Sequence, residues 1–251
     1  IKSHIEQHYG HKISKVHWTS KPGDIERSTG IPSSQKEDAS DLVIHAKNPK
    51  GKTVYHGISL KVTDSSKKNI TVSNPGRAAM HPDADKMIES HHKKINKEFP
   101  ELAGMKLSDR KSYVKQNSFL KHHLAVMHKS FLTKLAKKTA EHLTSLGTKN
   151  LADHIRQHVL QSAPTPMQKL GHHHLRLTTY TTRDGSYAHH GINPSEHYAS
   201  YLNDHKGLSV EHRGTGILYK HRGKTIAKLG FKLQSQSDPF SSVKGRADPT
   251  V

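Results

Sequence analysis

The spacing of hydrophobic residues changes twice along this chain of 251 residues, and no other feature limits its fold as strongly. Before residue 81 the apolar residues form short continuous or alternating runs, which are typical of β-strands. From His81 to about Leu160 they recur every three or four positions, as in amphipathic helices. Strand-like runs return after the helix-breaking APTP at 163–166. This order predicts an α/β core interrupted by a helical insertion.

The first 80 residues are expected to supply the first part of that core. A helix is followed by a short strand or turn that ends near Trp18. Residues 19–40 are rich in Gly, Pro and Ser and are expected to form a long loop. DLVIHAKN and KTVYHGISLKVT are interpreted as two neighbouring strands joined by the turn NPKG, and ITVSNPG as a third short extended segment.

Residues 81–165 are expected to form the helical insertion, and residues 166–251 to complete the core and end in a tail. The apolar stripe predicted to pack within the helices includes Phe119, Leu120, Leu124, Met127, Phe131 and Leu135. HLRLTTYTT and LSVEHR predict further strands, and GILYKHRGKTIAKLGFKLQS predicts a hairpin that turns at His221 to Gly223. PFSSVKGRADPTV is polar and is interpreted as the tail.

The composition favours a polyanionic partner. Lys and Arg number 40 and Asp and Glu 21, which gives a formal charge of 40 − 21 = +19. Such a charge draws a protein to nucleic acid, because each neutralised phosphate releases condensed counterions. No stretch reaches the roughly 18 to 20 apolar residues of a spanning helix, and no signal-peptide core is found, so a soluble protein without membrane contact is expected. The absence of cysteine excludes disulfides, thiolate catalysis and Cys-based zinc sites.

Two of the early strands carry a pattern of reactive residues. Asp41 opens the run DLVIHA, and the next run contains Ser59, Leu60 and Lys61. This pattern resembles the PD-(D/E)XK nuclease superfamily, the fold of many restriction enzymes and phage nucleases. Ser40-Asp41 stands where the family has Pro-Asp. Ser59-Leu60-Lys61 stands where it has an acidic residue, any residue and lysine.

The resemblance covers roughly residues 1–76 and implies a restriction-endonuclease-like α/β core with a mixed sheet, which hydrolyses DNA phosphodiester bonds. Asp41 and the backbone carbonyl of Leu60 would hold Mg²⁺, for which Mn²⁺ is a substitute, and Lys61 would orient the attacking water. A divalent ion held by oxygen ligands suits this chemistry, because it lowers the pKa of bound water and offsets charge on the phosphate.

Ser59 departs from the family pattern, because it places a hydroxyl where a second carboxylate is expected. Either a water on Ser59 links to the metal, or a carboxylate from elsewhere supplies the missing ligand. Glu6 lies on the first helix, where many family members have a further acidic residue, and Glu26 lies in the loop that follows. Both rank above Glu37 and Asp38. Without such a replacement the core would be a binding module that has lost catalysis.

Two basic segments are candidates for DNA contacts. SNPGR at 73–77 contains a strong turn signal, and Asn74 and Arg77 are expected either to shape that turn or to touch a phosphate beside the active site. The tip of the late hairpin carries Lys220, Arg222 and Lys224, which would enter a groove or grip phosphates. Ordinary surface charge explains the hairpin cations equally well.

Two alternatives to the metal nuclease stay open. The histidines at 172–174 and the segment AHHGINPSEHY, with His189, His190, Asn193 and His197, suggest an HNH nuclease, but the gaps are much narrower than that family has. Consecutive strand histidines point to opposite faces, so only alternate members would share one ion. The other alternative is a non-catalytic basic protein that binds or packages nucleic acid, which needs only the charge and the helices.

The expected function is therefore a Mg²⁺-dependent deoxyribonuclease that acts on double-stranded DNA. The resemblance places it in the host cytoplasm or in a phage particle, as a product of a phage or other mobile element. Sequence specificity, DNA against RNA, endo against exo cleavage, and oligomeric state are left open.

Overall fold

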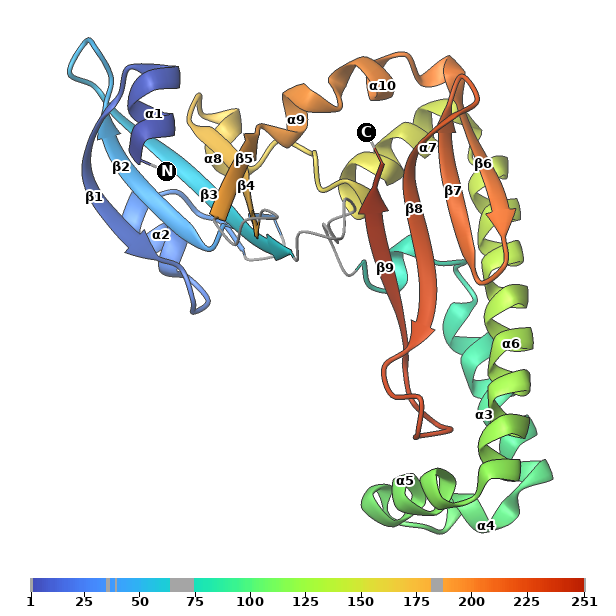
Figure 1. Ribbon diagram of the computed structural model, residues 1–251. Helices are drawn as coiled ribbons and strands as arrows, with labels where there is room; N and C mark the ends of the chain where they lie inside the picture. The colour runs from blue at the N-terminus through green and yellow to red at the C-terminus, as the bar shows by residue number, and fades with distance from the viewer. Residues whose placement is uncertain (1, 35–36, 39, 64–74, 182–186, 251) are drawn as a thin grey trace. The chain divides into compact units, whose positions relative to one another are not determined.

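The chain folds into two compact units, each built around its own sheet. The computed structural model describes residues 2–34, 37–38, 40–63, 75–181 and 187–250. The first unit comprises residues 1–70 and 162–200, and the second comprises residues 71–161 and 201–251 (Figure 1).

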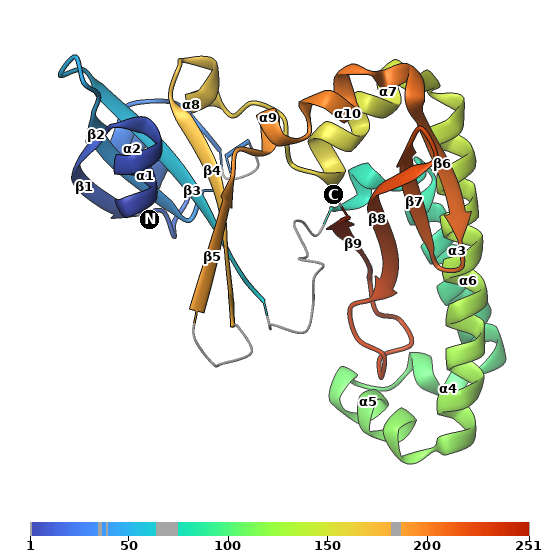
Figure 2. The ribbon, with the colours of Figure 1, turned by 45° about the horizontal axis from the view of Figure 1, so that its top comes forward.

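A mixed five-stranded sheet forms the first unit. Its strands are β1 (Lys12–Trp18), β2 (Leu42–Lys47), β3 (Thr53–Thr63), β4 (His173–Thr181) and β5 (Tyr187–Ile192), in the order β1-β2-β3-β4-β5. Neighbours are antiparallel except β3 and β4, which run parallel and lie side by side although they are far apart in sequence (Figure 2). The fold class is thus confirmed as α/β with a mixed sheet, and β1 ends at Trp18 as predicted.

Helices cover both faces of this sheet, because alternate strand residues are apolar on each side. α1 (Lys2–Tyr9) packs on one face, where Ile5 joins a core cluster with residues of β2, β3 and β4. On the other face α2 (Asp24–Thr29) and α8 (Pro166–Lys169) contribute Ile25 and Met167, which cluster with Val43. The segment 19–40, expected to be a loop, therefore contains a helix that Ile25 anchors. Two short helices, α9 (Pro194–His197) and α10 (Ala199–Asn203), follow β5.

The second unit combines the helical segment with a four-stranded antiparallel sheet. Its helices are α3 (Ala84–Glu98), α4 (Pro100–Ala103), α5 (Leu107–Gln116), α6 (Ser118–Ser145) and α7 (Gly147–His154), with a π-helical turn at Ile155–Val159 and 3₁₀ turns at Arg77–Ala79 and His205–Gly207. Its strands are β6 (Leu208–Arg213), β7 (Gly216–His221), β8 (Lys224–Leu233) and β9 (Val243–Pro249), paired in that order.

The long helix α6 holds this unit together by packing along β6 and β7 (Figure 1). Asn117 caps the start of α6, since its side-chain oxygen accepts a hydrogen bond from the backbone N–H of Leu120 at 3.0 Å. Five of the six residues predicted for the helical stripe are buried, whereas Phe119 is 75% exposed. Phe119 lies in the first turn of α6, directly after the cap, on a face that no neighbouring element covers among the described residues.

The late strands differ from the expectation that they complete the first core. Only β4 and β5 join the first sheet, and β6 to β9 form a sheet of their own. Tight connections explain this, because β7 and β8 are joined by Arg222 and Gly223 alone, both with positive φ, as in a type I′ hairpin. The expected polar tail also contains a strand, β9, whose Val243, Gly245 and Ala247 are buried beside β8.

Within the part of the chain that the structure describes, no helix combines the length and apolar character that crossing a bilayer requires.

Candidate active site

Asp41 and Lys61 come together at the ends of β2 and β3 in the first unit. The backbone N–H of Asp41 donates to the carbonyl of Ile58 at 2.8 Å, which continues the antiparallel ladder by one residue. Oδ2 of Asp41 accepts a hydrogen bond from the backbone N–H of Leu60 at 2.7 Å. The carboxylate is thereby held against the Ser59-Leu60-Lys61 segment while Asp41 itself stays exposed.

Lys61 occupies a half-buried position beside this carboxylate. Burial lowers the pKa of the Lys61 ammonium, the Asp41 charge opposes that shift, and Arg176 adds to it. Burial destabilises the charged form of lysine because less water solvates it, and a nearby carboxylate stabilises that form. Lys61 is therefore close enough to Asp41 for the two charges to interact, without a direct ion pair among the described residues.

Ser59 points into the interior, where its neighbour in β4 is Arg176. The two residues are paired in the parallel register, and both are buried. Burial lowers the pKa of Arg176 to about 10, which Tyr198 opposes by its charge and by a side-chain hydrogen bond. A buried cation thus stands next to Ser59, the position at which the sequence pattern it resembles would have a carboxylate. The sequence gives no local signal for this pairing.

A buried polar network supports the chain just before Asp41. The Asp38 carboxylate accepts hydrogen bonds from the Ser40 backbone N–H at 3.0 Å and from its hydroxyl at 2.5 Å. Nδ1 of His174 lies 3.3 Å from the Ser40 hydroxyl, and Thr19 donates to the Ser40 carbonyl. Burial lowers the pKa of His174, with Asp38 opposing the shift. The network fixes the segment that presents Asp41.

The structure places the two preferred replacement carboxylates on separate elements of the first unit, and their role as metal ligands stays a prediction. Glu6 lies on α1, which packs on the sheet face that carries Ile58, and Glu26 is exposed on α2. Neither side chain has a hydrogen bond or ion pair with any residue that the structure describes. Glu37 is exposed and accepts hydrogen bonds from Ser34. Of the four candidates, Asp38 is the one built into the network behind Asp41.

The residues at this site offer a partial ligand set for Mg²⁺. Oδ1 of Asp41 has no hydrogen-bond partner among the described residues, so an exposed carboxylate oxygen is available to a cation. Mg²⁺ keeps several waters and is often bound by one or two carboxylates together with substrate phosphates. Asp41 and the Leu60 carbonyl fit that pattern, and Ser59 next to buried Arg176 does not add a second charge.

The expected DNA-contacting residues belong to the second unit, except Asn74, which lies outside the described residues. Arg77 donates to the Val243 carbonyl at 2.9 Å and forms an ion pair with Asp85 at 2.8 Å. At the hairpin, Lys220 is paired with Glu211 and Arg222 with Asp204, whereas Lys224 is exposed. A cation that is already paired with a carboxylate gains less interaction energy from a phosphate. Lys224 is therefore the most available of these side chains for a phosphate contact.

The histidines of the HNH interpretation are spread over different environments. His172, His173 and His174 lie in or next to β4, and the chain's strand alternation turns them to different faces, as expected. Asn193 caps α9, and its side-chain oxygen accepts hydrogen bonds from the backbone N–H and the hydroxyl of Ser195. Among the side chains that the structure describes, no hydrogen bond joins Asn193 to a histidine.

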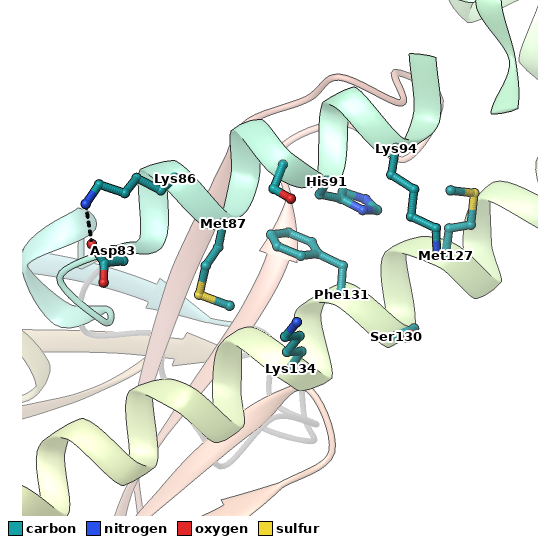
Figure 3. Close-up of a pocket in the computed structure, with 10 residues that line it drawn as sticks. Asp83, Lys86, Met87, His91, Lys94, Met127, Ser130, Phe131 and Lys134 are labelled. Atoms are coloured by element: carbon teal, nitrogen blue, oxygen red, sulfur yellow. Dashed lines mark ion pairs between the residues drawn. The ribbon is translucent and has the colours of Figure 1, made fainter. Parts of the chain in front are cut away.

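The second unit contains a cationic hollow of about 590 Å³ between α3 and α6 (Figure 3). Lys86, Lys94 and Lys134 line it, together with His91 and Phe131, whose rings stack 4.2 Å apart. Lys86 is paired with Asp83 at 3.0 Å, as Figure 3 shows, whereas Lys94 and Lys134 have no ion pair among the described residues. These two lysines are available to an anionic ligand.

No protein-family model matches the chain, and no curated protein sequence matches it significantly. Among solved structures, the chain is similar to the restriction endonuclease MspI, crystallised in complex with its cognate DNA. The match covers 94% of this chain and 71% of that one, at 9% sequence identity and a TM-score of 0.36. A likeness at this level carries no argument about activity.

Proposed function

We propose that this protein is a metal-dependent nuclease that hydrolyses DNA phosphodiester bonds at Asp41 and Lys61. The observation that supports this best is the contact between the Asp41 carboxylate and the Leu60 N–H, which holds the carboxylate beside the strand segment that carries Lys61. A carboxylate that can hold a divalent ion, with a cation close to it, suits phosphodiester hydrolysis.

Lys61 would act on the reacting phosphate and its water. Burial leaves the Lys61 ammonium less well solvated than the ammonium of a surface lysine, which lowers its pKa. For the same reason it would interact more strongly with an incoming anion. Arg176 lies two register positions away, opposite Ser59, and adds positive potential near the same strand end. Both cations favour the negative charge that builds up as the phosphate is attacked.

Asp41 and the Leu60 carbonyl would hold Mg²⁺ or Mn²⁺. Such an ion, when bound, supplies Lewis acidity and a lower pKa for its water. The Asp38–Ser40 network keeps Asp41 oriented, since Ser40 is fixed on both its backbone and its side chain. Preorganisation of this kind reduces the motion needed to reach a productive geometry.

Digestion of supercoiled plasmid DNA, with and without Mg²⁺ or Mn²⁺, tests the proposal. The unaltered protein is compared with Lys61→Ala and Asp41→Asn, at matched far-UV circular dichroism and matched DNA affinity. Lys15→Ala is the control, because it removes the same charge from an exposed position on β1. We expect metal-dependent cutting to fall by a factor of roughly 100 or more in the two site variants and to persist in the control.

A second candidate function follows from Ser59 and Arg176. A buried arginine beside a serine gives a cationic strand end that is one carboxylate short, which suits phosphate binding without hydrolysis. Fluorescence anisotropy with a labelled DNA duplex separates the two functions. If the unaltered protein binds the duplex and leaves plasmid intact with both metals, the nuclease proposal is wrong and DNA binding is the function.

A further inference from the structure

Three histidines from distant parts of the sequence meet on the α1 face of the first sheet. His11 follows the turn between α1 and β1, His56 lies in β3, and His173 opens β4. His56 is fully buried, His11 is 8% exposed and His173 is half-buried. The parallel register pairs His56 with His173 directly. The strand pairing, rather than any local motif, therefore brings the three imidazoles together.

The ring nitrogens of these histidines are within reach of a single ion. Nδ1 of His11 lies 3.0 Å from Nε2 of His56, and one nitrogen from each of the three residues lies within 4.8 Å of the others. In a tetrahedral zinc site with bonds of 2.0–2.1 Å, ligand nitrogens are about 3.3 Å apart. The 3.0 Å separation is close to that value and the other separations do not exceed 4.8 Å, so small side-chain rotations would bring all three nitrogens onto one ion.

The surroundings favour neutral imidazoles, which are the form that binds metals. The rings of His56 and His173 are stacked with centroids 4.7 Å apart, and Tyr9 packs against both, at 5.1 Å and 4.5 Å. Two charged imidazolium rings at this separation would repel each other.

We propose that His11, His56 and His173 form a binding site for one zinc-type dication. Imidazole nitrogens prefer Zn²⁺ and its neighbours in the first transition series to Mg²⁺, whose preferred ligands are oxygens. Three protein ligands leave a fourth tetrahedral position for water, on the side where His173 is accessible. The ion would tie the turn after α1 to β3 and β4, and thereby fasten the N-terminal helix to the sheet.

This site is separate from the proposed nuclease site. His56 and Lys61 lie five positions apart in β3, which corresponds to about 16 Å along a strand, and an odd separation places them on opposite faces. The inference therefore does not rest on the proposed function, and a nuclease-dead Asp41→Asn variant should keep the histidine site intact.

Titration with Co²⁺ tests the proposal, because tetrahedral cobalt gives intense visible d–d bands and octahedral cobalt gives weak ones. The tag-free chain is first stripped with EDTA, and the unaltered protein is compared with His173→Asn and His11→Asn. His172→Asn is the matched control, since it removes an adjacent histidine whose ring packs against Tyr55 instead. Competition with Zn²⁺, and the thermal unfolding midpoint with and without Zn²⁺, give readouts that do not depend on activity.

We expect one tetrahedral Co²⁺ per chain, displaced by Zn²⁺, in the unaltered protein and in His172→Asn. His173→Asn and His11→Asn should bind roughly 100-fold more weakly and lose the rise in unfolding midpoint that Zn²⁺ produces. An absence of tetrahedral bands in the folded, unaltered protein overturns the proposal. So does equal binding by His173→Asn and His172→Asn, which would assign the metal to scattered surface histidines.

Discussion

At the residue scale, Gly57 controls the position of the segment that leads to Asp41. A Cβ on Gly57 would lie 2.4 Å from the Ser40 hydroxyl, 2.7 Å from Cε of Met167 and 3.2 Å from Nδ1 of His174. These distances are too short for any side chain larger than hydrogen. The glycine in GISLKV is therefore required by close packing behind the candidate site.

Gly57→Ala is expected to lower the free energy of unfolding by about 2 kcal/mol, because the new methyl group overpacks a buried network. Urea unfolding followed by circular dichroism measures the change. Gly230→Ala is the control, since it is also a strand glycine but has open space around its Cβ position. Equal stability of the two variants would contradict the role assigned to Gly57.

A second residue-scale prediction concerns the buried residues His91 and His128. Nε2 of His91 lies 2.9 Å from Nδ1 of His128, within hydrogen-bond distance. Burial lowers the pKa of each from 6.5 to about 4. Between pH 6.5 and 4 the unfolded chain binds more protons at these histidines than the folded chain, so the free energy of unfolding falls as the pH falls. We expect the free energy of unfolding to fall by about 2 kcal/mol from pH 7 to pH 5, a figure that already includes a reduction for solvent screening.

Urea unfolding at pH 7 and pH 5 checks this loss. The double variant His91→Leu with His128→Leu should have a flatter profile, whereas His122→Gln, at an exposed position on α6, should keep the slope. A slope that the double variant leaves unchanged would assign the pH dependence to other groups, of which His154, with a pKa also lowered to about 4 by burial, is the first to test.

At the scale of secondary structure, Asn117 separates α5 from α6. Asn117→Ala removes the side-chain acceptor for the Leu120 N–H and should destabilise the second unit by about 1 kcal/mol. Asn96→Ala, at an exposed position in the last turn of α3, is the matched control and should be neutral or slightly stabilising. Denaturant unfolding resolves the difference, and indistinguishable midpoints would show that the cap is dispensable.

The elements that sequence patterns predicted are those defined by local signals. α1, β1, β2, β3 and the β7–β8 hairpin were predictable because each has its own periodicity or turn residues. β9 was missed because its buried face consists of Val243, Gly245 and Ala247, two of them small, and its strand character depends on pairing with β8. Phe119 was assigned to the core because helical spacing alone does not say which turn lacks a neighbour.

The candidate site was predictable only in part, for a related reason. Asp41 and Lys61 lie on adjacent strands joined by a short turn, so their proximity follows from sequence. The Ser59–Arg176 pairing and the His11, His56 and His173 cluster depend on the parallel contact between β3 and β4. The paired residues of β3 and β4 are more than 100 positions apart, and no periodicity specifies that register.

At the scale of the whole molecule, the net charge of +19 predicts that the proposed DNA binding depends strongly on salt. Not every cation should contribute equally. Lys94→Ala with Lys134→Ala removes two lysines of the α3–α6 hollow that have no ion pair among the described residues, whereas Lys93→Ala with Lys138→Ala removes two that pair with Glu89 and Glu141. Both double variants change the net charge by the same amount.

We expect the first double variant to reduce the slope of log K against log salt concentration by about 2, and the second to change it little. Fluorescence anisotropy with one labelled duplex over a range of salt concentrations measures both slopes. Equal reductions would mean that DNA senses only the total charge and that the hollow has no special part in binding.

The pairing of β3 with β4 also has a consequence for synthesis of the chain. β3 ends at Thr63 and β4 begins at His173, so 173 − 63 = 110 residues are added before β3 meets its parallel partner. At about 5 to 20 residues per second, the ribosome needs roughly 6 to 20 s for that stretch. During this time β3 has an unpaired edge, which is the kind of surface that templates aggregation. The unpaired edge of β3 is therefore the part of the nascent chain that a ribosome-associated chaperone would be expected to bind.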